Sequence, residues 1–170
     1  VRATAVDAAA RNVTLAGGTR LSFSKLVFAT GSQPIKPDIP GMDLPGVLTF
    51  RDVDDVNAIA AAKAAGTRVV VIGGGLLGLE AAYGLAKAGA RVTLLHLMDR
   101  LMERQLDHRA ALMLQRAVEA RGIAVRLQAQ TARIAGNGKV ESVELRDGTT
   151  IAADAVVVAV ESVRVGARHG

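Results

Sequence analysis

Three glycines, Gly73, Gly75 and Gly78, follow the spacing GxGxxG directly after an apolar, β-branched run, Val69 to Ile72. In such a loop the first glycine permits a tight turn, the second admits a phosphate close to the backbone, and the third lets a helix pack closely on the strand. Free N–H groups at the start of the helix, together with the helix dipole, favour an anion there. The spacing therefore predicts a loop that binds a dinucleotide through its pyrophosphate.

The candidate dinucleotide contacts are the loop and the first helical turn: Gly73, Gly74, Gly75, Leu76, Leu77 and Gly78. A further candidate is His96, which ends the next expected strand about 20 residues beyond the glycines, where a side chain reads the adenosine ribose. An acidic residue there would favour NADH, whereas a histidine accepts NADH or NADPH and mildly favours the NADPH phosphate. The alternative interpretation of His96 is an ordinary histidine at a strand end.

The elements around these residues have the order of a βαβ unit. Apolar spacing and capping residues predict helices over 53–65, 76–88 and 108–120, and strands over 69–72, 91–95, 123–127 and 155–160. Asp52 and Asp107 are the expected N-caps of the first and last helices. We therefore expect an α/β fold, in which a Rossmann-type, three-layer domain combines a parallel sheet with an antiparallel β-meander.

A duplication suggests how the chain is divided. Residues 18–31 align without gaps with residues 148–161, and each copy follows a strand-like segment and a glycine-containing turn. Each unit is expected to be a meander that ends in a buried apolar strand. We predict two related domains, 1–40 and 67–160, with a proline-rich linker and a helix between them over 41–66. A short tail, 161–170, follows the second domain.

Composition narrows the possible functions. The net charge is +5, but the arginines are scattered and only 2% of the 170 residues are aromatic, which disfavours nucleic-acid binding. The apolar runs are far shorter than the ~20 residues of a membrane span, and we expect a soluble, cytoplasmic protein. These residues include no cysteine, which excludes a thiol nucleophile or a thiolate-bound cluster within them. The histidines lack the spacing of metal ligands.

The order of several motifs resembles the FAD-dependent pyridine-nucleotide oxidoreductases. The motifs are the glycine loop and three others: ATGSQP at 29–34, RDVDDVNAI at 51–59 and VVVAV at 156–160. Within this family, HLMDRLMERQLD at 96–107 is similar to a segment of the large subunits of NAD(P)H-dependent nitrite reductases. The resemblance covers most of the chain and implies a flavoprotein that passes hydride from NAD(P)H to FAD.

The resemblance also implies roles for individual residues. Ala29, Thr30 and Gly31 match a motif that closes the FAD domain near the flavin nucleotide, while the glycine loop matches the NAD(P)H site. Glu80 matches a glutamate toward the nicotinamide end of that site. Its alternative interpretation is a glutamate in the first helical turn that interacts with the helix dipole.

The departures from the family pattern indicate a fragment whose partner is the rest of the flavoprotein chain. The N-terminal FAD loop and the interface domain are missing from these residues, so we expect no nitrite turnover by this segment alone. Where the family has a glycine the chain has Glu161, and we interpret 161–170 as a non-native or disordered tail produced by a frameshift.

Other function classes stay open on the sequence alone. A ferredoxin or rubredoxin reductase would share the same motifs, and a non-catalytic NAD(H)-sensing module would use a similar loop. The partial first domain argues against a sensor. A methyltransferase is a more distant alternative, because it usually lacks the full glycine series that continues to Glu80.

Overall fold

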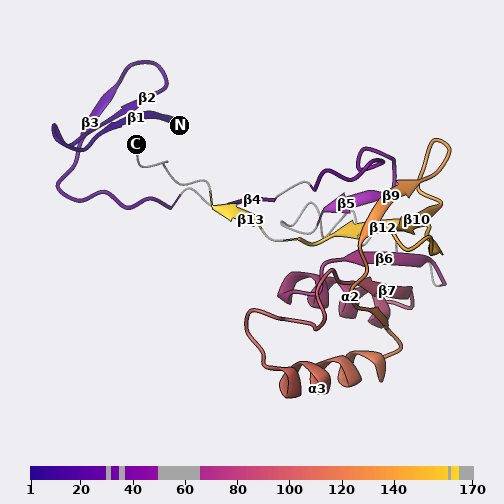
Figure 1. Cartoon of the computed structure of the whole chain (residues 1–170). Coiled ribbons are helices and arrows are strands. Elements are labelled where there is room, and N and C mark those ends of the chain that lie inside the picture. The colour runs from indigo at the N-terminus through magenta and orange to yellow at the C-terminus, as the bar shows by residue number, and fades with distance from the viewer. Residues whose placement is uncertain (30–31, 35–36, 50–65, 161, 165–170) are drawn as a thin grey trace. The chain divides into compact units, whose positions relative to one another are not determined.

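The structure is a computed structural model that describes residues 1–29, 32–34, 37–49, 66–160 and 162–164. These residues divide into two compact units, the first built on Val1–Ser32 and the second on Gln33–Val163. The second unit contains the glycine loop (Figure 1). The predicted helix over 53–65 lies outside the described residues.

The first unit is a small antiparallel meander. Its strands are β1 (Ala3–Asp7), β2 (Asn12–Leu15) and β3 (Arg20–Ser22), in the order β1-β2-β3. The prediction that a buried apolar strand follows them is wrong, because residues 26–29 form no strand and Val27 is 83% exposed. An extended segment needs a neighbouring strand to satisfy its backbone groups, and the described residues pair none with it.

The second unit is built on a five-stranded parallel sheet with the order β5-β12-β6-β7-β8. Its strands are β5 (Val47–Thr49), β6 (Arg68–Ile72), β7 (Arg91–Leu95), β8 (Ala124–Arg126) and β12 (Ala155–Val158). Four of them were predicted from buried apolar runs. The fifth, β5, follows Pro45 and Gly46 in the segment that was predicted to be a linker.

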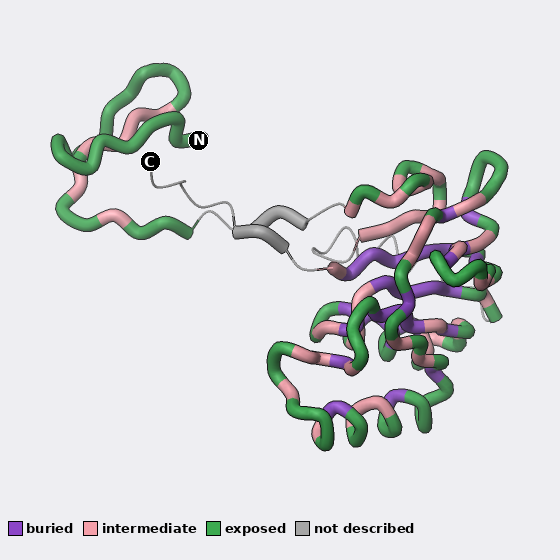
Figure 2. The backbone as a smooth tube through the Cα atoms, in the orientation of Figure 1, coloured by how far each residue is buried: buried purple, intermediate pink, exposed green. Residues whose placement is uncertain are grey.

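A layer packs on each face of this sheet. Val69 and Val71 of β6 face a cluster that includes Ala82 and Leu85 of helix α2, while Val70 and Ile72 face a second cluster on the other side. That second cluster includes residues of an antiparallel meander with the order β11-β10-β9, formed by Thr131–Ala135 (β9), Ser142–Leu145 (β10) and Thr150–Ala152 (β11). The central strands are buried on both faces (Figure 2). The predicted three-layer α/β fold is therefore confirmed.

The two described helices lie where they were predicted, and α3 has its predicted N-cap. Helix α2 spans Leu76–Lys87 and begins at Gly75, and helix α3 spans His108–Glu119. The Asp107 carboxylate accepts a hydrogen bond of 2.8 Å from the Ala110 N–H, as expected of an N-cap. The irregular segment between β7 and α3 lies next to the glycine loop.

The proline-rich segment packs within the second unit, against its sheet and meander. The Ile134 N–H donates to the Pro40 carbonyl and the Val140 N–H donates to the Pro45 carbonyl, over 2.8 and 2.9 Å. Ile39, Met42 and Leu44 are partly buried against the sheet and meander. These bonds lead the chain into β5, which explains why a strand forms within a segment predicted to be a linker.

Near the C-terminus, β13 (Ser162–Arg164) pairs with β4 (Ser32–Pro34) in a two-stranded sheet. The predicted tail therefore includes a short strand, while residues 161 and 165–170 lie outside the described residues. The frameshift hypothesis and the four domain boundaries stay predictions. None of the helices in the described ranges combines the length and apolar character that crossing a bilayer demands.

Candidate functional site: the glycine loop and its supports

The glycine loop connects the carboxyl end of β6 to α2, and its first and third glycines are required by close packing. Gly73 has φ of 124°, and a side chain there would collide with the Ala159 carbonyl. A side chain at Gly78 would collide with the Gly73 carbonyl, so this glycine allows α2 to begin directly above the strand. Both positions match the roles that the sequence predicted, a tight turn and a close helix-to-strand contact.

The second glycine, Gly75, differs because it faces open space. A Cβ atom built on Gly75 would meet no heavy atom within 4 Å. As the N-cap of α2, Gly75 has no side chain to occupy the N–H groups of the first turn. Leu76 and Leu77, the first two helical residues, are exposed. An anion can therefore approach these amides without displacing a protein group, and the residues present fit a pyrophosphate.

His96 lies beneath this loop. It is 8% exposed, and its Nδ1 atom accepts a hydrogen bond of 3.0 Å from the buried Gly74 N–H. Since a backbone N–H can only donate, Nδ1 carries no proton, and in the neutral ring the proton is on Nε2. Nε2 lies 2.9 Å from Oε2 of Glu103 and donates to it. Both ring nitrogens thus have protein partners, which favours the structural interpretation of His96 over direct ribose contact.

The irregular segment after His96 is fixed to the same loop residue. The Met102 N–H donates to the Gly74 carbonyl over 3.1 Å, and Leu101 is fully buried below Gly74. A Cβ atom on Gly74 would lie 2.6 Å from Cγ of His96 and 2.7 Å from Cδ2 of Leu101. Gly74 is therefore held through its N–H, its carbonyl and its Cα, and these contacts bring Glu103 to the loop.

Sequence reasoning did not single out Glu103. The available signal was its place within HLMDRLMERQLD, seven residues after His96. The remaining predicted site residues have different outcomes. Glu80 is exposed on α2 and lies beyond the first helical turn, which holds no acidic residue, so the dipole interpretation is wrong. Its contact with the nicotinamide end stays a prediction. Ala29 is exposed, while Thr30 and Gly31 lie outside the described residues.

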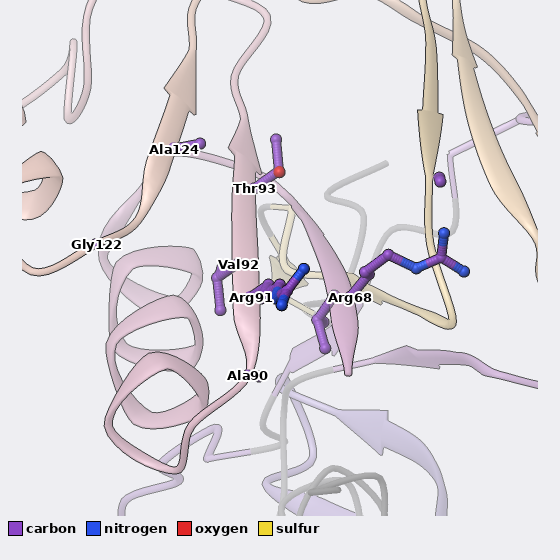
Figure 3. Close-up of a pocket in the computed structure, with 9 residues that line it drawn as sticks. Arg68, Ala90, Arg91, Val92, Thr93, Gly122 and Ala124 are labelled. Atoms are coloured by element: carbon purple, nitrogen blue, oxygen red, sulfur yellow. The ribbon is translucent and has the colours of Figure 1, made fainter. Parts of the chain in front are cut away.

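The surface hollow shown in Figure 3 is at the other end of the sheet. It has a volume of about 400 Å³ and is lined near the amino ends of β6 and β7 by Arg68 and Arg91, among others. Open parallel sheets bind ligands at the carboxyl ends of their strands, so the glycine loop is the stronger candidate. Among the described residues, no group of three or more acidic or histidine side chains could hold a metal ion.

The fold and the loop define a dinucleotide-binding α/β domain. Residues 1–163 match the pyridine nucleotide-disulphide oxidoreductase family, and the chain belongs to this family. The resemblance seen in the sequence is therefore confirmed.

Several relatives are similar over most of the chain. A nitrite reductase [NAD(P)H] from Bacillus subtilis is 47% identical over 138 residues, which are 81% of this chain and 17% of that protein. The nitrite reductase [NAD(P)H] large subunit of Klebsiella oxytoca is 40% identical over 89% of this chain and 16% of its own length. The chain thus spans about a sixth of these two relatives.

The solved structures include a ferredoxin reductase from Rhodopseudomonas palustris. It superposes with a TM-score of 0.86 at 32% identity, over 95% of this chain and 40% of that one. Among sequences, the ferredoxin--NAD(+) reductase component of a biphenyl dioxygenase system from Paraburkholderia xenovorans is 36% identical over 94% of this chain and 39% of its own length. The similarity therefore extends to reductases that are named for different electron acceptors.

Proposed function

We propose that this chain is the NAD(P)H-binding portion of a flavoprotein oxidoreductase, together with part of its FAD-binding domain. The observation that carries the proposal is that the loop glycines have different surroundings. Gly73 and Gly78 are closed in by protein, whereas Gly75 is open toward the first turn of α2. Membership of the family supports the same assignment.

The chemistry belongs to the cofactors, and the chain's residues bind and position them. In the whole flavoprotein, NAD(P)H and FAD would supply transfer of a hydride from nicotinamide C4 to flavin N5. The main-chain N–H groups around Gly75 would hold the pyrophosphate, and Ala29, Thr30 and Gly31 would close the flavin domain. Glu80 would lie toward the nicotinamide. No side chain of this segment needs to act as an acid or base.

We further propose that the whole protein is the cytoplasmic large subunit of an NAD(P)H-dependent nitrite reductase. This is supported by 47% identity to the Bacillus subtilis enzyme and by the segment 96–107. The second candidate is a ferredoxin or rubredoxin reductase, which is favoured by the similarity to the Rhodopseudomonas palustris structure. The coding sequence downstream separates the two, because a nitrite reductase requires cysteines that ligate an iron–sulfur cluster and sirohaem.

Nucleotide binding is tested by titrating the isotope-labelled full chain with NADH and with NADPH. We expect the backbone amide signals of residues 73–79 to shift, with those of the β1-β2-β3 meander of the first unit as an internal control. Unmoved signals at 73–79 in a folded sample would overturn the proposal. For the parent protein, yellow colour that NADH bleaches would support the flavoenzyme, and tight NADH binding without flavin would favour the sensing module instead.

A further inference from the structure

Glu103 lies eight residues beyond Leu95, the last residue of β7, yet its carboxylate contacts the side chain that follows this strand. In dinucleotide-binding sheets the acidic side chain that binds the ribose hydroxyls follows the second strand of the unit. Here that strand is β7, and the residue after it is His96, whose Nε2 donates to the Glu103 carboxylate over 2.9 Å. The residue that follows β7 is therefore not acidic itself, but its side chain contacts a carboxylate.

Three contacts fix Glu103 in place. Leu101 is 0% exposed and Met102 is bonded to the Gly74 carbonyl, so the backbone just before Glu103 is tied to the glycine loop. The Glu103 backbone carbonyl accepts a hydrogen bond from Arg100, and its carboxylate is held by His96. The side chain of Glu103 is 23% exposed against 9% for His96. His96 therefore orients the Glu103 carboxylate from the protein interior, and part of the carboxylate is open to solvent.

The chemistry of this carboxylate discriminates between the two nucleotides. A carboxylate offers about four lone-pair sites, and the bond from His96 uses one of them. The two hydroxyls of the adenosine ribose in NADH are donors that match the remaining sites. NADPH replaces one hydroxyl with a phosphate dianion, which a carboxylate repels and to which it cannot donate.

Two basic residues near the strand end make contacts within the protein. Arg100 donates to the Asp99 carboxylate over 3.0 Å and to the Glu103 backbone carbonyl over 3.3 Å. Arg126 ends β8 opposite Leu95, which packs against the meander side of the sheet. On that side the pKa of Asp147 is lowered, first by the Thr149 backbone N–H and also by the charge of Arg126. Arg100 is thus bonded to protein acceptors, one of them the Glu103 backbone carbonyl, and Arg126 lies on the meander side of the sheet.

We propose that Glu103, held by His96, is the residue that binds the adenosine ribose and makes this site prefer NADH to NADPH. The inference rests on the proposed function, because it requires the glycine loop to bind the pyrophosphate of the same nucleotide. It differs from the prediction from sequence, in which His96 itself contacts the ribose or the phosphate.

The test compares the dissociation constants of NADH and NADPH for the full chain and for Glu103→Gln, which keeps the size of the side chain and removes its charge. We expect the unsubstituted chain to bind NADH at least ten times more tightly than NADPH. In the variant, the NADH dissociation constant should rise about tenfold and the preference should fall to within about threefold. The matched control is Glu141→Gln, an exposed glutamate just before the meander strand β10, which should change neither constant.

The ratio of the two constants stays readable if Glu103→Gln is less stable, because a partly unfolded sample loses binding of both nucleotides by the same factor. If the ratio of the NADPH and NADH dissociation constants were unchanged in Glu103→Gln, as it would be when both nucleotides bind equally more weakly, the assignment of Glu103 would be overturned. Such a result would leave the proposed function intact. By contrast, the absence of any shift at residues 73–79 with either nucleotide would remove the proposed function itself.

Discussion

The Gly74 amide and the His96 imidazole form a buried hydrogen bond of 3.0 Å that joins the glycine loop to the end of β7. The bond gives the loop amide a partner inside the protein, where an unsatisfied donor is costly. It also fixes the imidazole so that its other nitrogen meets Glu103. A single side chain therefore supports both the loop and the carboxylate beside it.

Replacing His96 by leucine tests this support. His96→Leu keeps an apolar body of similar size but leaves the buried Gly74 N–H without its acceptor, so we expect a loss of about 2 kcal/mol in the free energy of unfolding. Urea denaturation measures it. The control is His108→Leu, an exposed histidine at the start of α3, which should change the stability by less than about 0.5 kcal/mol. Equal effects of the two substitutions would contradict the role of His96.

The N-cap of α3 gives a second prediction. Asp107→Ala removes the acceptor of the Ala110 N–H and should cost about 1 kcal/mol of stability, whereas Asp107→Asn keeps an oxygen in the same place and should cost much less. Thermal unfolding of both variants checks this. If the two variants lost the same stability, the charge of Asp107 near the helix end would explain the effect, and capping would not.

The elements of the second unit were predictable because their signals are local. A buried strand such as Val69 to Ile72 needs apolar residues on both faces, and Asp107 caps its helix through a residue three positions away. Strand β5 was missed because its three residues form a strand only through pairing with β12, more than one hundred residues later. Pairing of that kind leaves no local pattern.

The candidate site also has one part that local sequence signals predict and another that depends on contacts without a local pattern. The roles of Gly73, Gly75 and Gly78 follow from their spacing, since each is set within one strand, turn and helix. The contact of Glu103 with His96 depends on burying Leu101 below Gly74 and on an irregular segment with no periodic pattern. Sequence reasoning therefore singled out His96 at the end of the strand but did not find its contact with Glu103.

An ion pair at the amino ends of the strands predicts a dependence on pH. The Arg68 guanidinium donates to the Asp154 carboxylate, which also accepts the Arg68 backbone N–H, and these bonds lower the pKa of Asp154 from 3.8 to about 2. Because the folded pKa is the lower one, the stabilisation is present above pH 3.8 and is lost as the pH falls toward 2. Both side chains are nearly half exposed, so solvent screening keeps the effect small.

The measurement is the melting temperature of the unsubstituted chain and of Asp154→Asn between pH 5 and pH 2. We expect the variant to melt about 2 °C lower at pH 5, with the gap closing at the acidic end. A gap that stays constant over this range would contradict the pKa assignment. NADH binding at pH 7 should be the same in both, since this pair lies at the amino ends of β6 and β12 and the glycine loop follows the carboxyl end of β6.

Replacing Gly75 and Gly78 by alanine, one at a time, should separate effects on NADH binding from effects on the stability of the fold. Gly75 is extended, with φ of −82°, and faces open space, so Gly75→Ala should leave the unfolding free energy unchanged. Its methyl group would stand where the pyrophosphate approaches, and we expect the NADH dissociation constant to rise about tenfold. Gly78→Ala instead pushes against the Gly73 carbonyl and should destabilise the fold by roughly 2 kcal/mol. Calorimetric titration and urea denaturation of both variants provide the comparison. If Gly75→Ala bound NADH normally while remaining folded, the open face of the loop would not be the pyrophosphate site.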